Sequence, residues 1–190
     1  MIDNRKFYQK SIKEHGISAQ GVHWNSKYTQ YKRFEIFTKL IKKDIKDSIV
    51  IDAGCGFAEY YNYLQNNHKI PKRYIGIDIF EDMVDISSKR YPFLEFYTLD
   101  ILEDELIYGD YYLCSGAMNL LHKDKLFYFI HRCYTHSAKG FIFNYLQSLT
   151  FVDISKEEII SYCKTLCDNI KIKDDYLDND FTVYMKKRLD

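Results

Sequence analysis

The stretch VIDAGCGFAEY, residues 50–60, decides the fold class of this chain. It opens with apolar residues interrupted only by Asp52, which is typical of a buried strand, and Gly54 and Gly56 then turn the chain. Apolar side chains recur at helical spacing over residues 60–64. The stretch therefore predicts a strand, a glycine turn and a helix. In such a turn the missing side chains let a ligand approach the backbone closely, and the amides that open the helix face it.

The alternation of strand and helix continues on the C-terminal side of this stretch. Short apolar runs predict strands, and apolar residues at helical spacing predict the helices that connect them. The expected strands are residues 49–53, 74–79, 93–99, 110–115 and 141–146. One connecting helix is expected over residues 81–90, and a later one carries Leu126, Ile130 and Cys133 on one face.

The last third of the chain follows a different pattern. Ser155 and Glu158 form an S-x-x-E capping box, which predicts the start of a helix. Alternating apolar residues over 170–172 and 181–185 then flank a turn around residues 178–179, as in an antiparallel hairpin. We therefore expect an α/β fold with a doubly wound, mostly parallel seven-stranded sheet that ends in an antiparallel C-terminal hairpin.

Carboxylates stand beside the ends of three successive predicted strands. Asp52 precedes the first glycine of the turn, and Asp100 follows the third strand. Asp78 ends the second strand about 20 residues after Gly56, the spacing expected of a carboxylate that accepts hydrogen bonds from a ribose. A single Asp at such a place is more often a helix cap or a turn residue. Three at successive strand ends predict one ligand crevice at the carboxyl edge of the sheet.

These motifs resemble those of the class I S-adenosylmethionine-dependent methyltransferases, which carry an acidic D-x-G-x-G loop, an acid after the second strand and another after the third. The resemblance spans about residues 49–187 and is strongest in the first two motifs. It implies a Rossmann-like domain over residues 46–190, with S-adenosylmethionine as cofactor and Asp78 on both ribose hydroxyls. The cofactor contacts that it implies within this domain are Asp52, Gly54, Gly56, Asp78, Ile79, Met83, Asp100, Ile101 and Ser115.

Residues 1–45 are expected to form an N-terminal helical leader. Residues 25–26 offer two capping side chains, Asn and Ser, for a helix that runs to about Lys43. The apolar stripe of this helix also holds Gln30 and Arg33. Their polar ends therefore point toward the domain, where buried polar groups need partners.

The pattern W-x-S-x-x-x-Q-x-x-R-F, residues 24–34, resembles the leader of a group of small bacterial methyltransferases. The resemblance implies a lid in which Trp24, Gln30 and Arg33 contact the cofactor, with the guanidinium on its carboxylate. A salt bridge or hydrogen bond to the domain surface explains the two polar side chains on the stripe equally well.

Dinucleotide binding is the rival reading of the glycine turn. Its fingerprint needs a third small residue for helix packing, and Glu59 stands at that place. Two signatures of base methylation are also absent, because SGAMNLL stands in place of an N-P-P-Y type of motif and no Pro is followed by Cys. Hydride transfer and these two kinds of base methylation are therefore disfavoured.

The methyl acceptor is expected to be a small molecule. The 190 residues leave room for one domain, and 27 basic and 27 acidic residues give no net charge to attract nucleic acid. Methyl transfer from a sulfonium needs no protonation of the leaving group, so positioning alone can supply much of the rate. His122 is the candidate base, with Asn119 and His23 as further candidates on the substrate side.

The remaining expectations concern location, metals and alternatives. The polar amino terminus and the lack of a long apolar segment predict a cytoplasmic protein with no membrane partner. The five cysteines lack the paired spacing of a zinc site, which predicts no metal. The alternatives to small-molecule methylation are an RNA or protein methyltransferase, and a methyltransferase-like domain that binds the cofactor and acts through a protein partner.

Overall fold

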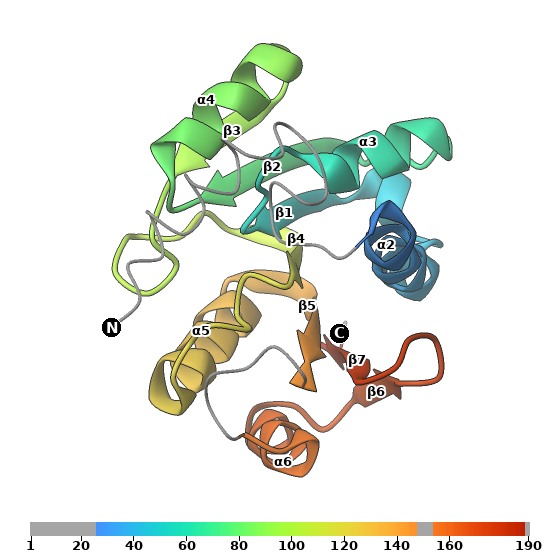
Figure 1. Cartoon of the computed structure of the whole chain (residues 1–190), viewed down its shortest axis with the longest axis vertical. Helices are drawn as coiled ribbons and strands as arrows, with labels where there is room; N and C mark the ends of the chain where they lie inside the picture. The colour runs from blue at the N-terminus through green and yellow to red at the C-terminus, as the bar shows by residue number, and fades with distance from the viewer. Residues whose placement is uncertain (1–25, 148–153, 189–190) are drawn as a thin grey trace.

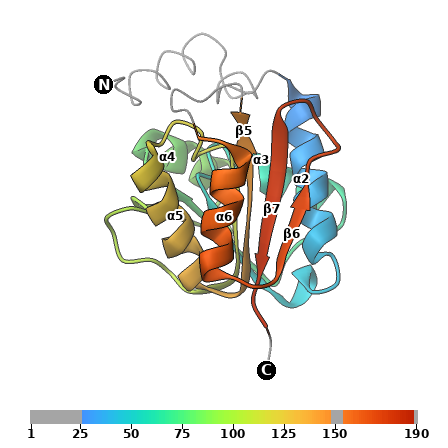
Figure 2. The same cartoon turned by 90° about the horizontal axis from the view of Figure 1, so that it is seen from below.

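A computed structural model describes residues 26–147 and 154–188 of the chain. The described residues form one seven-stranded sheet with helices on both faces (Figures 1 and 2). The strands are β1 (Ile49–Ala53), β2 (Arg73–Asp78), β3 (Glu95–Thr98), β4 (Gly109–Ser115), β5 (Ser137–Leu146), β6 (Ile170–Lys173) and β7 (Asp180–Lys186).

The order of the strands in the sheet is β3-β2-β1-β4-β5-β7-β6. Strands β1 to β5 are mutually parallel, whereas β7 runs antiparallel to both β5 and β6. The order reverses beside β1, and ligands of such sheets bind at this point, beyond the carboxyl ends of the strands. The expected doubly wound sheet with an antiparallel C-terminal hairpin is confirmed.

Helices of the described chain cover the two faces of the sheet in separate groups. The helices are α2 (Lys27–Ile41), α3 (Glu59–Asn66), α4 (Glu81–Arg90), α5 (Lys123–Thr135) and α6 (Lys156–Leu166), with a short 3-10 helix at Ile45–Asp47. Helices α2 and α3 bury aromatic side chains against one face, where Phe34 and Tyr60 meet Tyr111 and Tyr184. Helices α5 and α6 bury Ile130 and Ile159 against the other. The sheet is thus packed between two hydrophobic cores, one on each face.

Local capping signals set the starts of two helices as the sequence predicts. Ser26 accepts a hydrogen bond from the Thr29 amide and caps α2, which ends at Ile41 rather than near Lys43. Ser155 and Glu158 form the complete capping box of α6. Each cap satisfies amides that the first helical turn leaves without partners.

The third strand is shorter than its apolar run suggests. The expected strand over residues 93–99 is wrong at both ends, since β3 holds only Glu95–Thr98. The Leu94 amide donates to the Tyr91 carbonyl and so closes a turn that leaves Phe93 exposed. An apolar side chain in a turn made the run look longer than the strand.

Candidate functional site

The glycine turn joins β1 to α3 at the carboxyl edge of the sheet. Gly54 and Gly56 have φ angles of 78° and 52°, in the region that favours glycine. The Gly54 amide donates to the Ile77 carbonyl at 2.7 Å, which fastens the turn to β2. A Cβ atom on Gly54 would lie 2.3 Å from the Cβ of Ala117, in the turn that follows β4. Two turns therefore meet here at a distance that only glycine allows.

Asp78 lies beside this turn, at the end of β2. Its Oδ2 accepts the Gly56 amide at 2.9 Å, and its Oδ1 accepts the Phe80 amide at 3.0 Å. The side chain is buried, and this burial raises the pKa of Asp78, while hydrogen bonds from the Phe80 and Gly56 amides act to lower it. Each carboxylate oxygen keeps further acceptor capacity after these bonds. The two amides thus orient a carboxylate that can accept two more hydrogen bonds from a vicinal diol.

Asp52 lies deeper, within β1. It is 4% exposed, and its carboxylate accepts a hydrogen bond from the Tyr74 hydroxyl on the neighbouring strand. Burial raises the pKa of Asp52 to about 7; the Tyr74 hydrogen bond acts to lower it and the charge of Asp78 to raise it. The partner that the structure gives this carboxylate is therefore a core tyrosine.

The residues expected around an adenine differ in exposure. Ile79 is 52% exposed just past the end of β2, whereas Met83 on α4 and Ile101 after β3 are buried. Asp100 is half-buried and accepts the Leu102 amide at 2.8 Å, so it caps its own turn. These residues follow β2 and β3, which are neighbours in the sheet.

Three buried oxygen atoms near the ends of α2, β4 and β5 have no hydrogen-bond partner among the described residues. They are the Oε1 of Gln30, the Oγ of Ser115 and the Oδ1 of Asn144. Ser115 and Asn144 are register partners on adjacent parallel strands, so their side chains lie on the same face of the sheet. Buried polar atoms without partners are rare in folded proteins. The neighbouring oxygens of Ser115 and Asn144 therefore suit a polar ligand that donates hydrogen bonds.

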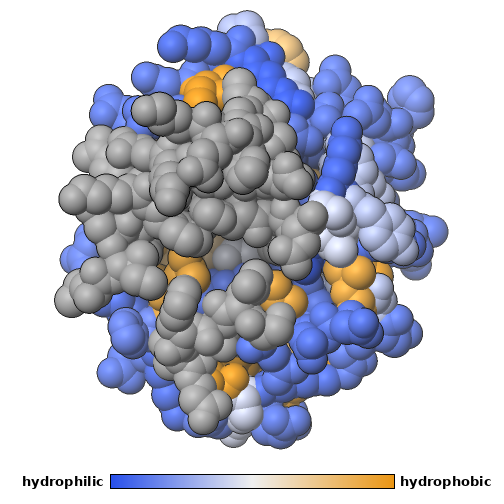
Figure 3. Space-filling view, viewed as in Figure 1, coloured by the Kyte–Doolittle hydropathy of each residue, from blue (hydrophilic) through white to orange (hydrophobic). Residues whose placement is uncertain are grey.

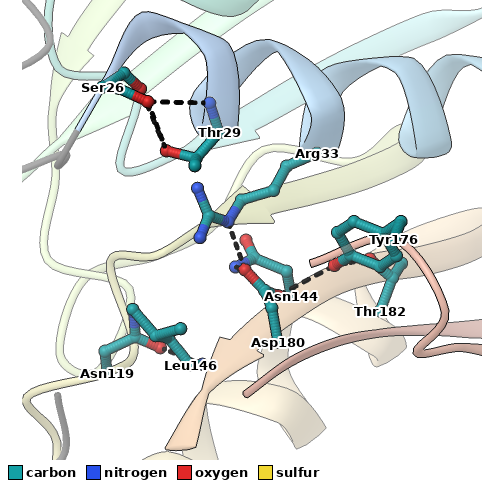
Figure 4. Close-up of polar contacts among 9 residues, drawn as sticks. All are labelled: Ser26, Thr29, Arg33, Asn119, Asn144, Leu146, Tyr176, Asp180 and Thr182. Atoms are coloured by element: carbon teal, nitrogen blue, oxygen red, sulfur yellow. Dashed lines mark hydrogen bonds and ion pairs between the residues drawn. The ribbon is translucent and has the colours of Figure 1, made fainter. Parts of the chain in front are cut away.

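Arg33, expected on the cofactor carboxylate, reaches into a polar cluster under α2 (Figure 4). Its Nε donates to Asp180 Oδ2 at 2.5 Å, and both side chains are buried. Asn144 donates to Asp180 Oδ1 at 3.2 Å, and the hydroxyl of Tyr176 donates to the same oxygen at 2.8 Å. The structural salt bridge that the sequence allowed for Arg33 is thus present in the molecule.

Two of the three substrate-side candidates, Asn119 and His122, lie in the described part of the chain. The Oδ1 of Asn119 accepts the Leu146 amide at 3.2 Å and so ties the turn after β4 to the end of β5. His122 is exposed and precedes α5, without capping it through its side chain. His23, like Trp24 of the leader, lies outside the described residues. The role of His122 as a base stays a prediction.

Three residues of this region escaped the sequence analysis. Tyr74 is the partner of Asp52, while Asn144 and Asp180 surround Arg33. Asn144 carried a usable signal, because it is the one side-chain amide in the apolar run of residues 141–146. Asp180 carried none, since it follows the polar turn at residues 178–179 and resembles part of it.

No group of three or more His, Cys, Asp and Glu residues within 26–147 and 154–188 is arranged to hold a metal ion. Across these ranges, no helix has both the length and the apolar character that a bilayer span requires. On the face seen in Figure 3, the described surface is mostly hydrophilic, and apolar residues form small separate spots.

Comparisons with known proteins identify the fold. No protein-family model matches the sequence, and no curated protein matches it. Among solved structures, an S-adenosylmethionine-dependent methyltransferase from Clostridium acetobutylicum is 15% identical over 96% of this chain and 98% of its own, with a TM-score of 0.68. Magnesium protoporphyrin IX methyltransferase from Synechocystis, solved with S-adenosylmethionine bound, is 14% identical over 95% of this chain and 84% of its own, with a TM-score of 0.67.

A third similar structure is the methyltransferase domain of a bacterial Hen1 protein, 10% identical over 82% of this chain and 98% of its own, with a TM-score of 0.65. At such identities the likeness is one of fold. The chain has the Rossmann-like fold of the class I S-adenosylmethionine-dependent methyltransferases.

Proposed function

We propose that the protein is an S-adenosylmethionine-dependent methyltransferase whose acceptor is a small molecule. The observation that carries the proposal is Asp78, a buried carboxylate that the Gly56 and Phe80 amides orient beside the glycine turn. A carboxylate held in this way at the end of a second strand matches the ribose-binding acid of such folds. The Oγ of Ser115, at the end of β4, has no hydrogen-bond partner within residues 26–147 and 154–188 and supports the same site.

The residues that fit the cofactor divide by the part they would hold. Asp78 would accept the ribose hydroxyls, and Ile79, Met83, Asp100 and Ile101 would surround the base. Gly54, Gly56 and Ser115 would line the methionine end, with Asp52 beneath them, and Trp24, Gln30 and Arg33 would approach it from the leader. The cofactor supplies a methyl group on a sulfonium. The chain's own contribution is to bind, to orient and to keep water out, and no proton need be moved by a residue of the site.

The acceptor is proposed to be a small molecule on three grounds. The formal charge of the chain is zero, so no overall field draws a polyanion to it. The Oδ1 of Asn144, buried near the end of β5, has no hydrogen-bond partner among the described residues, which suits a compact ligand with hydroxyl or amine donors. The similar structure from Synechocystis is named for a small-molecule acceptor. Binding of tRNA at submicromolar affinity that weakens with salt would contradict this part of the proposal.

The Asp78→Asn variant tests the cofactor assignment. We expect S-adenosylhomocysteine to bind the wild-type protein and to raise its melting temperature, since a ligand at 100 times its Kd adds about 2.7 kcal/mol of stability. In Asp78→Asn the ribose loses a charged acceptor, a contact worth about 1.5 to 3 kcal/mol, so affinity should fall at least tenfold. Titration calorimetry measures both.

The matched control for this test is Asp85→Asn, an exposed acid on α4 that should leave the affinity unchanged. Circular dichroism should show both variants folded. A wild-type protein that binds NADH and not S-adenosylhomocysteine would refute the cofactor assignment, and unchanged affinity in folded Asp78→Asn would refute the role of this residue.

A further inference from the structure

Helix α4 holds two carbonyl groups of the glycine turn from outside it. The Ser87 hydroxyl donates to the Gly56 carbonyl at 2.7 Å, and an Nη1 hydrogen of Arg90 donates to the Phe57 carbonyl at 2.8 Å. Ser87 is buried and Arg90 is half-buried, so both side chains lie on the inward face of α4. The turn is therefore fastened on two consecutive residues by an element that the glycine motif does not contain.

The backbone of this turn needs such support. Gly56 and Ala58 both have positive φ angles, of 52° and 57°. Ala58 is not a glycine, and a residue with a side chain in this region persists only when its surroundings hold it there. Hydrogen bonds from Ser87 and Arg90 to the two carbonyls that precede Ala58 help to stabilise this backbone conformation.

Arg90 also gives Glu59 a structural role. Glu59 is the residue that distinguishes this turn from a dinucleotide-binding fingerprint. The same guanidinium nitrogen that donates to Phe57 also pairs with the Glu59 carboxylate. The other oxygen of Glu59 accepts from Asn62 at 3.2 Å. Glu59 thus completes the attachment of the turn to α4, at a place where a small residue would leave Arg90 without this carboxylate.

Ser87 acts on the residue that orients Asp78. Gly56 donates its amide to Asp78 and accepts the Ser87 hydroxyl at its carbonyl, so the two side chains hold opposite ends of one glycine. Ser87 is 0% exposed and touches solvent nowhere. Because Gly56 has no side chain to limit its rotation, a fixed carbonyl is what keeps its amide directed at Asp78.

We propose that Ser87 is a positioning residue for cofactor binding, which acts through Gly56 on the Asp78 carboxylate. This inference rests on the proposed function. Its consequence is that the effect of Ser87 on affinity depends on Asp78. A serine that merely packed well would lower affinity equally with and without that carboxylate.

A double-mutant cycle tests this dependence. We expect Ser87→Ala to weaken S-adenosylhomocysteine five- to tenfold in the wild-type background and less than twofold in Asp78→Asn. Ser88→Ala is the matched control, because Ser88 lies next in α4 and, within the described part of the chain, no hydrogen bond joins it to the turn. Equal loss of affinity in the two backgrounds would overturn the proposal, as would equal effects of Ser87→Ala and Ser88→Ala.

A measurement without cofactor separates this proposal from the proposed function. The Gly56 amide should exchange its hydrogen at least tenfold faster in Ser87→Ala than in Ser88→Ala, as followed by NMR, because its orientation toward Asp78 is loosened. Unchanged exchange at Gly56 would overturn the positioning role even if the cofactor binds. Faster exchange in a protein that does not bind S-adenosylhomocysteine would instead place the failure in the proposed function.

Discussion

Asp180→Ala is expected to lower the free energy of unfolding by about 3 to 5 kcal/mol, because it leaves the Arg33 charge buried without its carboxylate. The two side chains are 4% and 0% exposed, so water cannot take the place of the lost partner. Asn144 and Tyr176 lose the acceptor of their hydrogen bonds in the same variant. Urea denaturation of the two proteins measures the difference.

Asp178→Ala is the control for this variant, since Asp178 lies exposed in the same turn. It should change stability by less than about 0.5 kcal/mol, as surface substitutions do. The double variant Arg33→Met with Asp180→Ala removes both charges. Its loss in free energy of unfolding should be smaller than the sum of the losses in the two single variants. Strict additivity would show that the pair is not coupled.

Arg33→Lys decides whether the leader helix also serves the cofactor. Lysine keeps the charge but loses the planar donor set of the guanidinium. If Arg33 reaches the methionine carboxylate as well as Asp180, the affinity for S-adenosylmethionine should fall more than the affinity for adenosine, which has no carboxylate. Equal losses for the two ligands in the folded variant would mean that Arg33 serves the scaffold alone.

Asp52→Asn is expected to remove a pH dependence from the stability of the protein. The pKa of Asp52 is raised to about 7 from its usual value near 4, so the folded state holds this proton more tightly than the unfolded chain does. The resulting stabilisation is complete below about pH 4 and is lost as the pH rises through 7. Between about pH 4 and pH 7 the wild-type protein should lose about 1.4 kcal/mol of unfolding free energy per pH unit relative to Asp52→Asn.

Denaturation curves of the two proteins between pH 4 and 8 give this difference directly. The side-chain amide introduced by Asp52→Asn would still offer an oxygen to the Tyr74 hydroxyl, so the variant keeps the hydrogen bond without the charge. Asp47→Asn, which changes an exposed acid, should instead follow the wild-type protein at every pH. Parallel curves for wild type and Asp52→Asn would show that Asp52 titrates near its ordinary pKa.

Features encoded by neighbouring residues could be predicted from the sequence. Gly54 and Gly56 stand at two of the three positions of the glycine turn that have a positive φ, the third being Ala58. The capping box of Ser155 and Glu158 involves residues three apart, and the spacing of Asp78 from the turn reflects one strand–helix–strand unit. Short-range geometry of this kind leaves a pattern in the sequence.

Contacts between distant residues left no such pattern. Arg33 and Asp180 are 147 residues apart, and no sequence pattern near either residue predicts that the two pair. The periodicity of α2 placed Arg33 on the inward face correctly, but it gave no means to tell a protein carboxylate from a cofactor carboxylate. Ser87 was missed for a similar reason, because a polar residue in a helix is ordinarily at the surface.

The position of β7 between β5 and β6 has a consequence for synthesis on the ribosome. While the chain has been made only as far as residue 179, β5 has a bare edge and β6 has no strand to join. The nascent protein must then remain soluble with an incomplete sheet, the kind of species that aggregates or recruits chaperones. A premature stop just before Asp180 deprives α2 of its carboxylate and leaves β5 and β6 without the strand that joins them.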